Sequence, residues 1–116
     1  MEIKTIQGNK FTDDRGEVSF VNDFDFKNVK RFYQVSNHSK NFIRAWHGHR
    51  NEGKYVYVVN GTILIGAVKL STPSYSDDPA QNINTEEVPK KFILSSNKPE
   101  ILYIPPNHAN GFKTLT

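Results

Sequence analysis

Residues 54–70 read KYVYVVNGTILIGAVKL and contain the strongest structural signal in the 116-residue chain. Valine, isoleucine and tyrosine dominate both halves of this stretch, and Asn60-Gly61 separates them. An Asn-Gly pair between two β-rich runs is typical of a tight hairpin, because both residue types tolerate a positive φ. The stretch therefore predicts two paired strands, at residues 54–59 and 62–70.

The rest of the chain predicts further short strands. No segment of ten or more residues keeps the 3.6-residue apolar period of a helix, and turn-forming clusters recur instead. We expect the other strands at residues 17–21, 29–35, 42–47, 91–94, 101–104 and 111–114. Many short strands with turns between them are typical of an all-β sandwich or barrel. The long polar stretch 71–87 predicts a functional or mobile loop.

Length and composition exclude several classes of protein. The chain has room for one domain, residues 1–116, and no apolar run approaches the roughly 18 to 20 residues of a membrane helix. The N-terminus lacks the apolar core of a secretory signal, and the absence of cysteine excludes disulfides and thiolate chemistry. These features favour a cytoplasmic protein. The mild net charge of +3, scattered along the chain, favours a small anionic ligand over nucleic acid.

The segment His47-Gly48-His49 is the first candidate for chemistry. Residues two apart on a strand share a face, so both imidazoles can point into one cavity. The alternative is an ordinary pair of surface histidines. The nearby Arg44 and Lys54 favour the functional interpretation.

A histidine beside a lysine suits proton transfer. An imidazole titrates near neutrality and can act as a general base, and an ammonium such as that of Lys54 can stabilise an enolate oxygen. Arginine side chains bind phosphates bidentately. The combination suits abstraction of a proton next to a ketone on a phosphate-bearing substrate. Such a reaction needs no cofactor, because proton transfer changes no overall oxidation state.

The spacing of Arg44 and His47 raises a geometric question. The two residues are an odd number of positions apart, so an ideal strand places them on opposite faces. A β-bulge between them, or an Arg44 at the very start of the strand, would bring both to one face. Otherwise Arg44 faces outward or toward a partner subunit.

Several segments, in the same order along nearly the whole chain, resemble the dTDP-4-dehydrorhamnose 3,5-epimerase family. They are DRG at 14–16, FYQ at 32–34 with NHS at 37–39, RAWH at 44–47, GKYV at 53–56 with VNG at 59–61, STPSY at 71–75 and IPPNHANGF at 104–112. Two stretches, RFY at 31–33 and RAWHGHR at 44–50, are also similar to dTDP-sugar 3,4-ketoisomerases, which carry the second histidine. The resemblance implies a cupin-like jelly-roll β-barrel.

The resemblance also implies roles for single residues. His47 matches the catalytic base, Lys54 lies near the keto oxygen of the sugar, and Tyr33 or His49 would return the proton. The expected substrate is a dTDP-linked 4-keto-6-deoxy sugar, and the expected activity is that of an epimerase or ketoisomerase. The residues expected to bind it are Arg15 and Arg44 at the diphosphate, with Gln34, Asn37 and Asn110.

The chain also departs from the epimerase pattern. The epimerases continue beyond the IPPNHANGF-like strand into a region with a tyrosine acid and an aspartate that pairs with the catalytic histidine, and residues 1–116 include neither. Asn110 stands where that family has a histidine. A non-catalytic sugar-nucleotide-binding domain therefore stays open as an alternative. A homodimer is expected, since an N-terminal strand in these families often pairs with the partner and a small barrel has edges to cover.

A metal-dependent cupin is the less favoured alternative. A metal site normally needs three or four protein ligands, which here would be His47 and His49 with Glu52 or His108. Lys54 occupies the position where metal-binding cupins carry a glutamate, and its ammonium would repel a cation. The sequence therefore predicts no metal ligand set.

Overall fold

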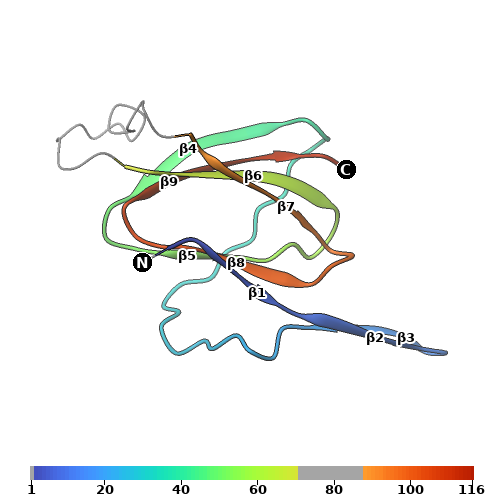
Figure 1. Ribbon diagram of the computed structural model, residues 1–116. Coiled ribbons are helices and arrows are strands. Elements are labelled where there is room, and N and C mark those ends of the chain that lie inside the picture. Colours follow the sequence, from blue (N-terminus) through green and yellow to red (C-terminus); the bar gives the residue numbers. More distant parts are fainter. Residues whose placement is uncertain (1, 71–87) are drawn as a thin grey trace.

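The computed structural model describes residues 2–70 and 88–116, and these residues form strands, turns and irregular segments (Figure 1). The loop expected at 71–87, with the family-like segment 71–75, lies outside them. The strands of the described part are β1 (Lys4–Gln7), β2 (Asn9–Asp13), β3 (Gly16–Phe20), β4 (Ile43–His49), β5 (Lys54–Val56), β6 (Thr62–Lys69), β7 (Lys90–Ser95), β8 (Glu100–Ile104) and β9 (His108–Thr114). None of these residues belongs to a helix that is long and apolar enough to cross a membrane.

Two antiparallel sheets enclose the core. One has the strand order β4-β9-β6-β7 and the other β1-β8-β5, and the two lie across from each other in Figure 1. Buried side chains from both sheets meet in one cluster, made of Ile65, Ala67, Leu94, Leu102 and Ile104. The all-β, cupin-like jelly roll is confirmed, although the two sheets are not hydrogen-bonded into a closed barrel.

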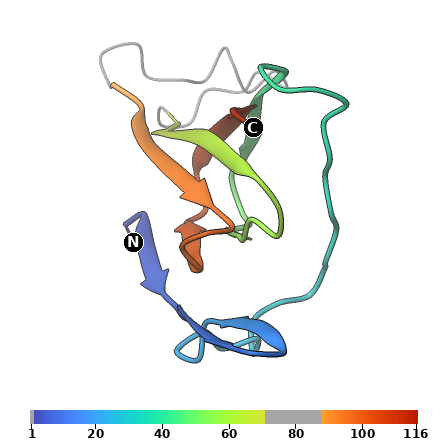
Figure 2. The same ribbon diagram turned by 90° about the vertical axis from the view of Figure 1, so that its right-hand side faces the viewer.

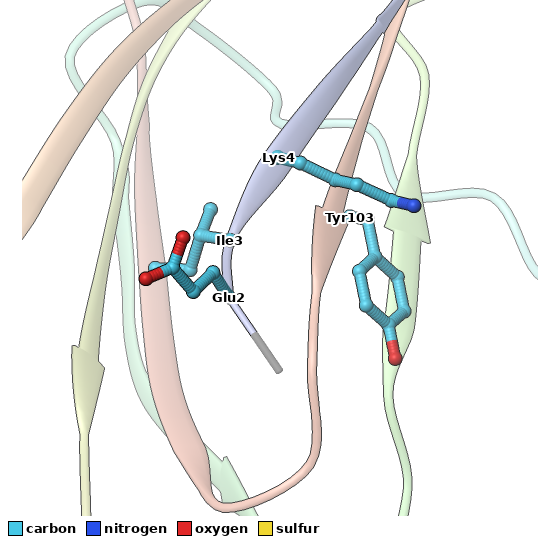
Figure 3. Close-up of a pocket in the computed structure, with 4 residues that line it drawn as sticks. All are labelled: Glu2, Ile3, Lys4 and Tyr103. Atoms are coloured by element: carbon cyan, nitrogen blue, oxygen red, sulfur yellow. The ribbon is translucent and has the colours of Figure 1, made fainter.

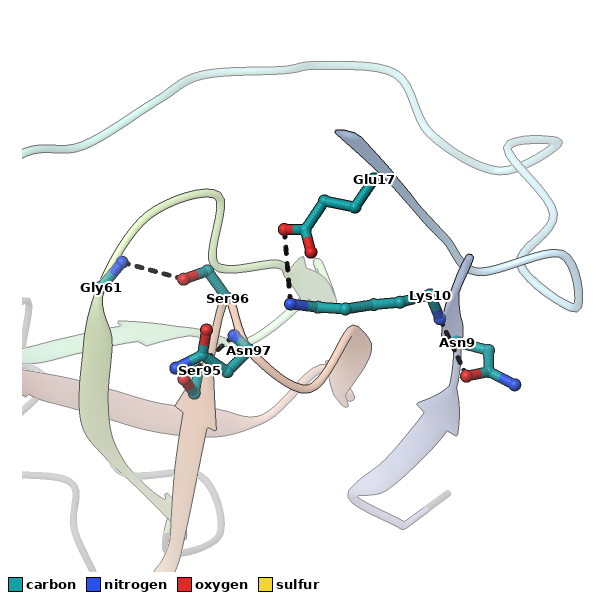
Figure 4. A network of polar contacts seen from close by, with 7 residues as sticks. All are labelled: Asn9, Lys10, Glu17, Gly61, Ser95, Ser96 and Asn97. Carbon is teal, nitrogen blue, oxygen red and sulfur yellow. Dashed lines mark hydrogen bonds and ion pairs between the residues drawn. The ribbon is translucent and has the colours of Figure 1, made fainter. Parts of the chain in front are cut away.

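The Asn60-Gly61 turn is not the hairpin that the sequence predicts. Strand β5 pairs with β8 and strand β6 with β7 and β9, so the turn carries the chain from one sheet to the other. Gly61 has a φ of 91°, but Asn60 does not share the positive φ that a tight hairpin needs at both residues. The Gly61 N–H instead donates to Ser96 Oγ (3.2 Å), in the connection from β7 to β8 (Figure 4).

The other strand predictions differ mainly in the first 42 residues. The strand expected at 29–35 is wrong: residues 21–42 follow an irregular path, and Phe32 within them is 85% exposed. Strands β1 and β2 were not predicted at all. Strands β3, β4, β6, β7, β8 and β9 lie within a few residues of the expected ranges.

The β2–β3 hairpin projects from the two sheets (Figures 1 and 2). Its two-residue turn is Asp14-Arg15. Phe11 and Val18 are cross-strand partners on one face and are 59% and 60% exposed. An ion pair between Lys10 and Glu17 (3.5 Å, Figure 4) lies on the other face. The hairpin is therefore amphipathic, with its apolar face open.

Candidate functional site

Strand β4 carries Arg44 and His47 on the same face. Arg44 pairs with Phe112 and His47 pairs with Asn110, and the register shifts between them. Directly paired residues of an antiparallel ladder share a face, and Phe112 packs against the core cluster. Both Arg44 and His47 therefore lie on the inner face of the four-stranded sheet. Of the alternatives that the odd spacing left open, the structure shows the β-bulge, as a register shift between Arg44 and His47.

Two paired glycines make room for this bulge. Gly111 of β9 pairs with Gly66 of β6, and a Cβ on Gly111 would overlap the Cβ of Ala45. On Gly66, a Cβ would lie 3.4 Å from the ring of Trp46. Because both glycines lack a side chain, the outer face of the sheet is flat at this point. The bulge lies close to the backbone of Gly111, and the Trp46 ring lies close to the backbone of Gly66.

Polar side chains hold β4 from both sides. Arg44 Nε donates to Asn37 Oδ1 at 2.7 Å, and the Asn37 amide donates to the hydroxyl of Thr114. The buried Asn110 donates from its amide nitrogen to the backbone oxygen of His47 at 3.2 Å. Asn37 and Asn110 thus position Arg44 and His47 by direct hydrogen bonds.

Lys54 faces the inner side from the opposite sheet. It pairs with Ile104 of β8, a member of the core cluster, and therefore shares the inner face with it. The Lys54 ammonium lies 5.9 Å from the centre of the Tyr33 ring. The guanidinium of Arg31 lies 5.6 Å from the same ring. Tyr33 consequently contacts two cations, and each contact is a cation–π interaction.

A carboxylate joins this group of cations. Glu52 Oε1 lies 3.1 Å from Nδ1 of His49 and 3.6 Å from the guanidinium of Arg31. His49 ends β4, and Glu52 lies in the turn between β4 and β5. The turn thus brings the end of β4, in one sheet, close to the start of β5, in the other. The irregular segment 21–42 adds Arg31 to this group.

Burial and the net effect of nearby charges favour the neutral form of the His49 imidazole. Partial burial lowers the pKa of His49 from its ordinary value of 6.5, and the ammonium of Lys54 lowers it next. The carboxylate of Glu52 opposes them, while Arg31 and His47 lower the pKa by smaller amounts. Near neutral pH the imidazole is therefore unprotonated at one nitrogen and available as a base.

The arrangement of side chains around His49 does not favour a metal ion. Across residues 2–70 and 88–116, no three His, Cys, Asp or Glu side chains gather closely enough to hold one. His49 and Glu52 do touch, but Lys54 and Arg31 contribute positive charge beside them. The group suits an anionic ligand instead.

A separate hollow of about 330 Å³ lies beside β1 and is lined by Glu2, Ile3, Lys4 and Tyr103 (Figure 3). Lys4 pairs with Tyr103, and Tyr103 pairs with Tyr55, so these three point away from the core. Burial raises the pKa of Tyr103 above its ordinary value, and Tyr55 adds to that effect. This hollow is on the outer face and does not contain the residues discussed above.

Comparison with known proteins identifies the family. The family model described as dTDP-4-dehydrorhamnose 3,5-epimerase matches residues 1–116. The chain belongs to this family. The family predicted from the sequence is confirmed, and with it the class of sugar-nucleotide epimerases and isomerases. No curated protein matches the chain.

Solved structures support the same fold. A 3,4-ketoisomerase from Helicobacter canadensis has a TM-score of 0.69 at 18% identity, over 100% of this chain and 76% of that chain. A dTDP-4-dehydrorhamnose 3,5-epimerase from Elizabethkingia anophelis has a TM-score of 0.68 at 22% identity, over 99% and 63%. A dTDP-6-deoxy-D-glucose-3,5-epimerase from Legionella pneumophila, in complex with dTDP-4-keto-L-rhamnose, has a TM-score of 0.66 at 25% identity, over 98% and 61%. The chain thus spans less than two thirds of these two epimerases.

Most of the residues predicted for the site come together, and two do not. Arg15 lies at the tip of the projecting hairpin, where its guanidinium bonds Asp13 at 2.6 Å and lowers the pKa of that carboxyl. Gln34 lies in the irregular segment and is exposed. The remaining predicted residues are placed on or beside the inner face of β4 and β5: Tyr33, Asn37, Arg44, His47, His49, Lys54 and Asn110.

Two members of the charged group were missing from the predicted site. Arg31 entered the sequence analysis only through the RFY stretch, and Glu52 only as an alternative metal ligand. The signal for Glu52 is its spacing of three residues from His49 across a tight turn. The contact of Arg31 depends on the path of residues 21–42, which no local pattern predicts.

Proposed function

We propose that this chain transfers a proton next to the ketone of a dTDP-linked 4-keto-6-deoxy sugar, as an epimerase or ketoisomerase without a cofactor. The observation that carries this proposal is the placement of two histidines and a lysine on facing inner surfaces. His47 and His49 come from β4, and Lys54 comes from β5. A sugar between the two sheets would meet a base on one side and a cation on the other.

The chemistry balances with these groups alone. A neutral histidine takes the proton from the carbon next to the ketone, and the electron pair of the broken C–H bond moves to the ketone oxygen. The ammonium of Lys54 stabilises the resulting enolate. A proton returned to the same carbon from the other face, by Tyr33 for example, gives the epimer. The oxidation state of the sugar as a whole does not change.

Arg44 and Arg15 would bind the diphosphate. Arg44 is on the inner face of β4, with its Nε held by Asn37, which leaves its terminal nitrogens for phosphate oxygens. Gln34 follows Tyr33 and would contact the nucleotide or the sugar. Arg15 lies on the projecting hairpin, so its part in binding requires a second copy of the chain.

The exposed apolar face of the hairpin supports a homodimer. A two-stranded hairpin alone is marginally stable in water, and Phe11 and Val18 face solvent on this one. Packing that face on a second copy would bury both side chains and carry Arg15 toward the site of that copy. The proposal predicts a dimer by light scattering, and a monomer when Val18→Ser and Phe11→Ser are combined.

Keto isomerisation is the second candidate within the same class. Arg31, Tyr33 and His49, which resemble the ketoisomerase stretches, lie together in one charged group. In this reaction a proton leaves C3 and another is delivered to C4, while the hydroxyl proton of O3 is lost and the C4 carbonyl becomes a hydroxyl. The product is the 3-keto sugar, which proton NMR distinguishes from an epimer.

Deuterium incorporation tests the proposal. The chain is incubated in deuterated water with a dTDP-4-keto-6-deoxy sugar, and ring deuterium is measured by NMR. We expect incorporation at a carbon next to the ketone. Loss of incorporation is expected in Lys54→Met and in a His47→Ala/His49→Ala double variant. Wild-type incorporation no higher than in the double variant would refute the proposal.

Two further predictions from the sequence concern the chain as a whole. We propose that residues 1–116 fold as one cupin-like domain, which limited proteolysis would test. We also propose a cytoplasmic location, which fractionation of the source cells would test.

A further inference from the structure

We propose that Thr114 is a positioning residue. Through the Asn37 amide, its hydroxyl holds the Arg44 guanidinium end-on to the diphosphate of a bound sugar nucleotide. The inference rests on the proposed function, because it explains how the phosphate-binding arginine of β4 is oriented. Thr114 lies outside the motifs that carry the family resemblance, so no role follows for it from them.

Thr114 is the last residue of β9 and lies on the inner face of the four-stranded sheet. It pairs with Ile63 of β6, which packs against the core cluster, so both side chains point to the same side. Arg44 pairs with Phe112, two positions before Thr114 and on the same face. The Thr114 hydroxyl therefore lies on the face that carries Arg44, on the neighbouring strand.

Thr114 binds the segment that leads into β4 through its side chain and its backbone. Its hydroxyl oxygen accepts a hydrogen bond from the Asn37 amide nitrogen at 2.5 Å. Its backbone oxygen accepts one from the Asn41 N–H at 2.6 Å, and its backbone N–H donates to the Phe42 oxygen at 3.2 Å. The backbone bonds hold the turn before β4 against the end of β9, and the side-chain bond is the one that leads to Arg44.

The direction of each side-chain hydrogen bond follows from what the groups can donate. The Arg44 Nε–H only donates, so at 2.7 Å it must face the amide oxygen of Asn37. The NH2 group of Asn37 then points to Thr114, whose hydroxyl oxygen accepts. An amide turned over would bring its NH2 group against the Arg44 Nε–H, a donor against a donor. The acceptor on Thr114 therefore favours the amide orientation that binds Arg44.

This bond also determines how Arg44 meets an anion. A guanidinium binds a phosphate through two parallel N–H groups, either Nε with one terminal nitrogen or the two terminal nitrogens together. Because Asn37 occupies Nε, the end-on arrangement through the terminal nitrogens remains. Arg44 is exposed, and a long exposed side chain loses rotamer freedom when it binds a ligand. An arginine that is already held loses less of that freedom and binds more tightly.

The alternative is that the Thr114 hydroxyl only stabilises the end of a strand. Thr62 provides the comparison, because it begins β6 in the same sheet and its hydroxyl bonds Ser95 Oγ at 3.1 Å. Ser95 lies on β7, at the opposite edge of the sheet from β4. Replacing either threonine by valine removes a side-chain hydrogen bond at a strand terminus, but the bond of Thr114 leads to Arg44 and that of Thr62 leads away from it.

The experiment compares Thr114→Val with Thr114→Ser and with the matched control Thr62→Val. Calorimetry measures the affinity of each for dTDP and for thymidine, which lacks the phosphates. The same affinities are measured in Arg44→Lys and in the double variant Arg44→Lys/Thr114→Val. Nitrogen-15 NMR of the arginine Nε–H groups, with Arg44 assigned by its loss in Arg44→Lys, reports how fast that proton exchanges with water.

Thr114→Val should weaken dTDP binding by about threefold to tenfold, as the loss of one hydrogen bond does, and leave thymidine binding unchanged. The Arg44 Nε–H should exchange faster with water in this variant. Thr114→Ser keeps the hydroxyl and should restore most of the affinity, and Thr62→Val should behave as the wild type does. In Arg44→Lys, adding Thr114→Val should not weaken dTDP binding further, because the group that Thr114 positions is gone.

The failures are distinguishable. If the wild type does not bind dTDP, the proposed function fails, and exchange of the Arg44 Nε–H alone then decides whether Thr114 positions Arg44. If Thr114→Val matches Thr62→Val in both dTDP affinity and Nε–H exchange, the inference is wrong even though the protein binds dTDP. The inference is also wrong if Thr114→Val weakens thymidine and dTDP binding equally, or weakens dTDP binding as much in Arg44→Lys as in the wild type.

Discussion

The β2–β3 hairpin and the four-stranded sheet differ in how far their apolar side chains are buried. In the sheet, Ile65 and Leu94 are 2% and 1% exposed, and the opposite sheet covers them. In the hairpin, Phe11 and Val18 are more than half exposed. The apolar face of the four-stranded sheet is therefore covered within the chain, whereas that of the hairpin is open.

The two regions also divide the expected binding residues. The sheet presents His47, His49 and Arg44 on its inner face, which Lys54 faces from the opposite sheet. Arg15 instead lies at the tip of the hairpin and bonds to Asp13. The proposed site therefore has two parts. Its proposed proton-transfer groups depend on the packed core, whereas the proposed contribution of Arg15 to phosphate binding depends on where the hairpin docks.

The largest expected effect is on the free energy of unfolding, which should fall far more for a substitution in the packed core than for one in the hairpin. Leu102→Ala removes a fully buried side chain and should lower the free energy of unfolding by about 2–5 kcal/mol. Val18→Ser, measured at a protein concentration low enough to keep the chain monomeric, should change it by about 0.5 kcal/mol or less, as exposed substitutions usually do. Urea unfolding measures both. Equal losses would contradict the contrast between a packed sheet and an open hairpin.

The next effect concerns the bulge that turns Arg44 inward. Gly111→Ala places a Cβ against Ala45 and should cost about 1–3 kcal/mol, as overpacking does. It should also weaken dTDP binding by moving Arg44. Gly66→Ala is the matched control, since its Cβ would make only ordinary van der Waals contacts, with the edge of the Trp46 ring at 3.4 Å and the backbone oxygen of Lys90 at 3.8 Å. Calorimetry of dTDP binding checks both variants, and equal behaviour would show that the bulge does not depend on Gly111.

A smaller effect is expected at the hairpin tip. Arg15→Ala should weaken dTDP binding by about tenfold, which corresponds to roughly 1.4 kcal/mol, without changing the dimer. Lys10→Gln alters a cation on the same hairpin that pairs with Glu17, and should leave the affinity unchanged. If Arg15→Ala binds dTDP as the wild type does, the hairpin has no part in the site.

The smallest effect is a change in the titration of His49. Lys54→Met removes a cation that lowers the pKa of His49, so that pKa should rise in the variant. In the wild type the folded-state pKa lies below the ordinary 6.5 of an unfolded chain. Protonation therefore favours unfolding, and the contribution of His49 to stability is lost as the pH falls below 6.5. NMR titration of the imidazole measures the shift, and an unchanged or lowered value in Lys54→Met would contradict the proximity of the two residues.

The sequence predicted the elements whose signals are local. Short runs rich in β-forming residues, separated by turn-forming clusters, located β6, β7 and β8. The Asn60-Gly61 turn shows the limit of such signals, because a local pair predicts a change of direction but not which strand the next one joins. The strand expected at 29–35 failed for a related reason: local β propensity does not tell whether a segment finds a partner, and residues 29–35 join none of the sheets of the described residues.

The site was predictable to a similar extent. His47, His49 and Lys54 are close in sequence, and their approach follows from strand alternation and a short turn. The contact between Arg31 and Glu52 depends on the course of a segment without regular structure. The proposed approach of Arg15 to the site depends on packing between two copies of the chain, which no pattern within one chain contains.

A crystal structure of the protein with a dTDP-linked sugar tests the central claim most directly. We predict a sugar between β4 and β5, in contact with His47, His49 and Lys54, and a diphosphate bound by Arg44 and by Arg15 of the partner subunit. A ligand bound instead in the outer hollow beside Lys4 and Tyr103, away from all of these side chains, would contradict the account.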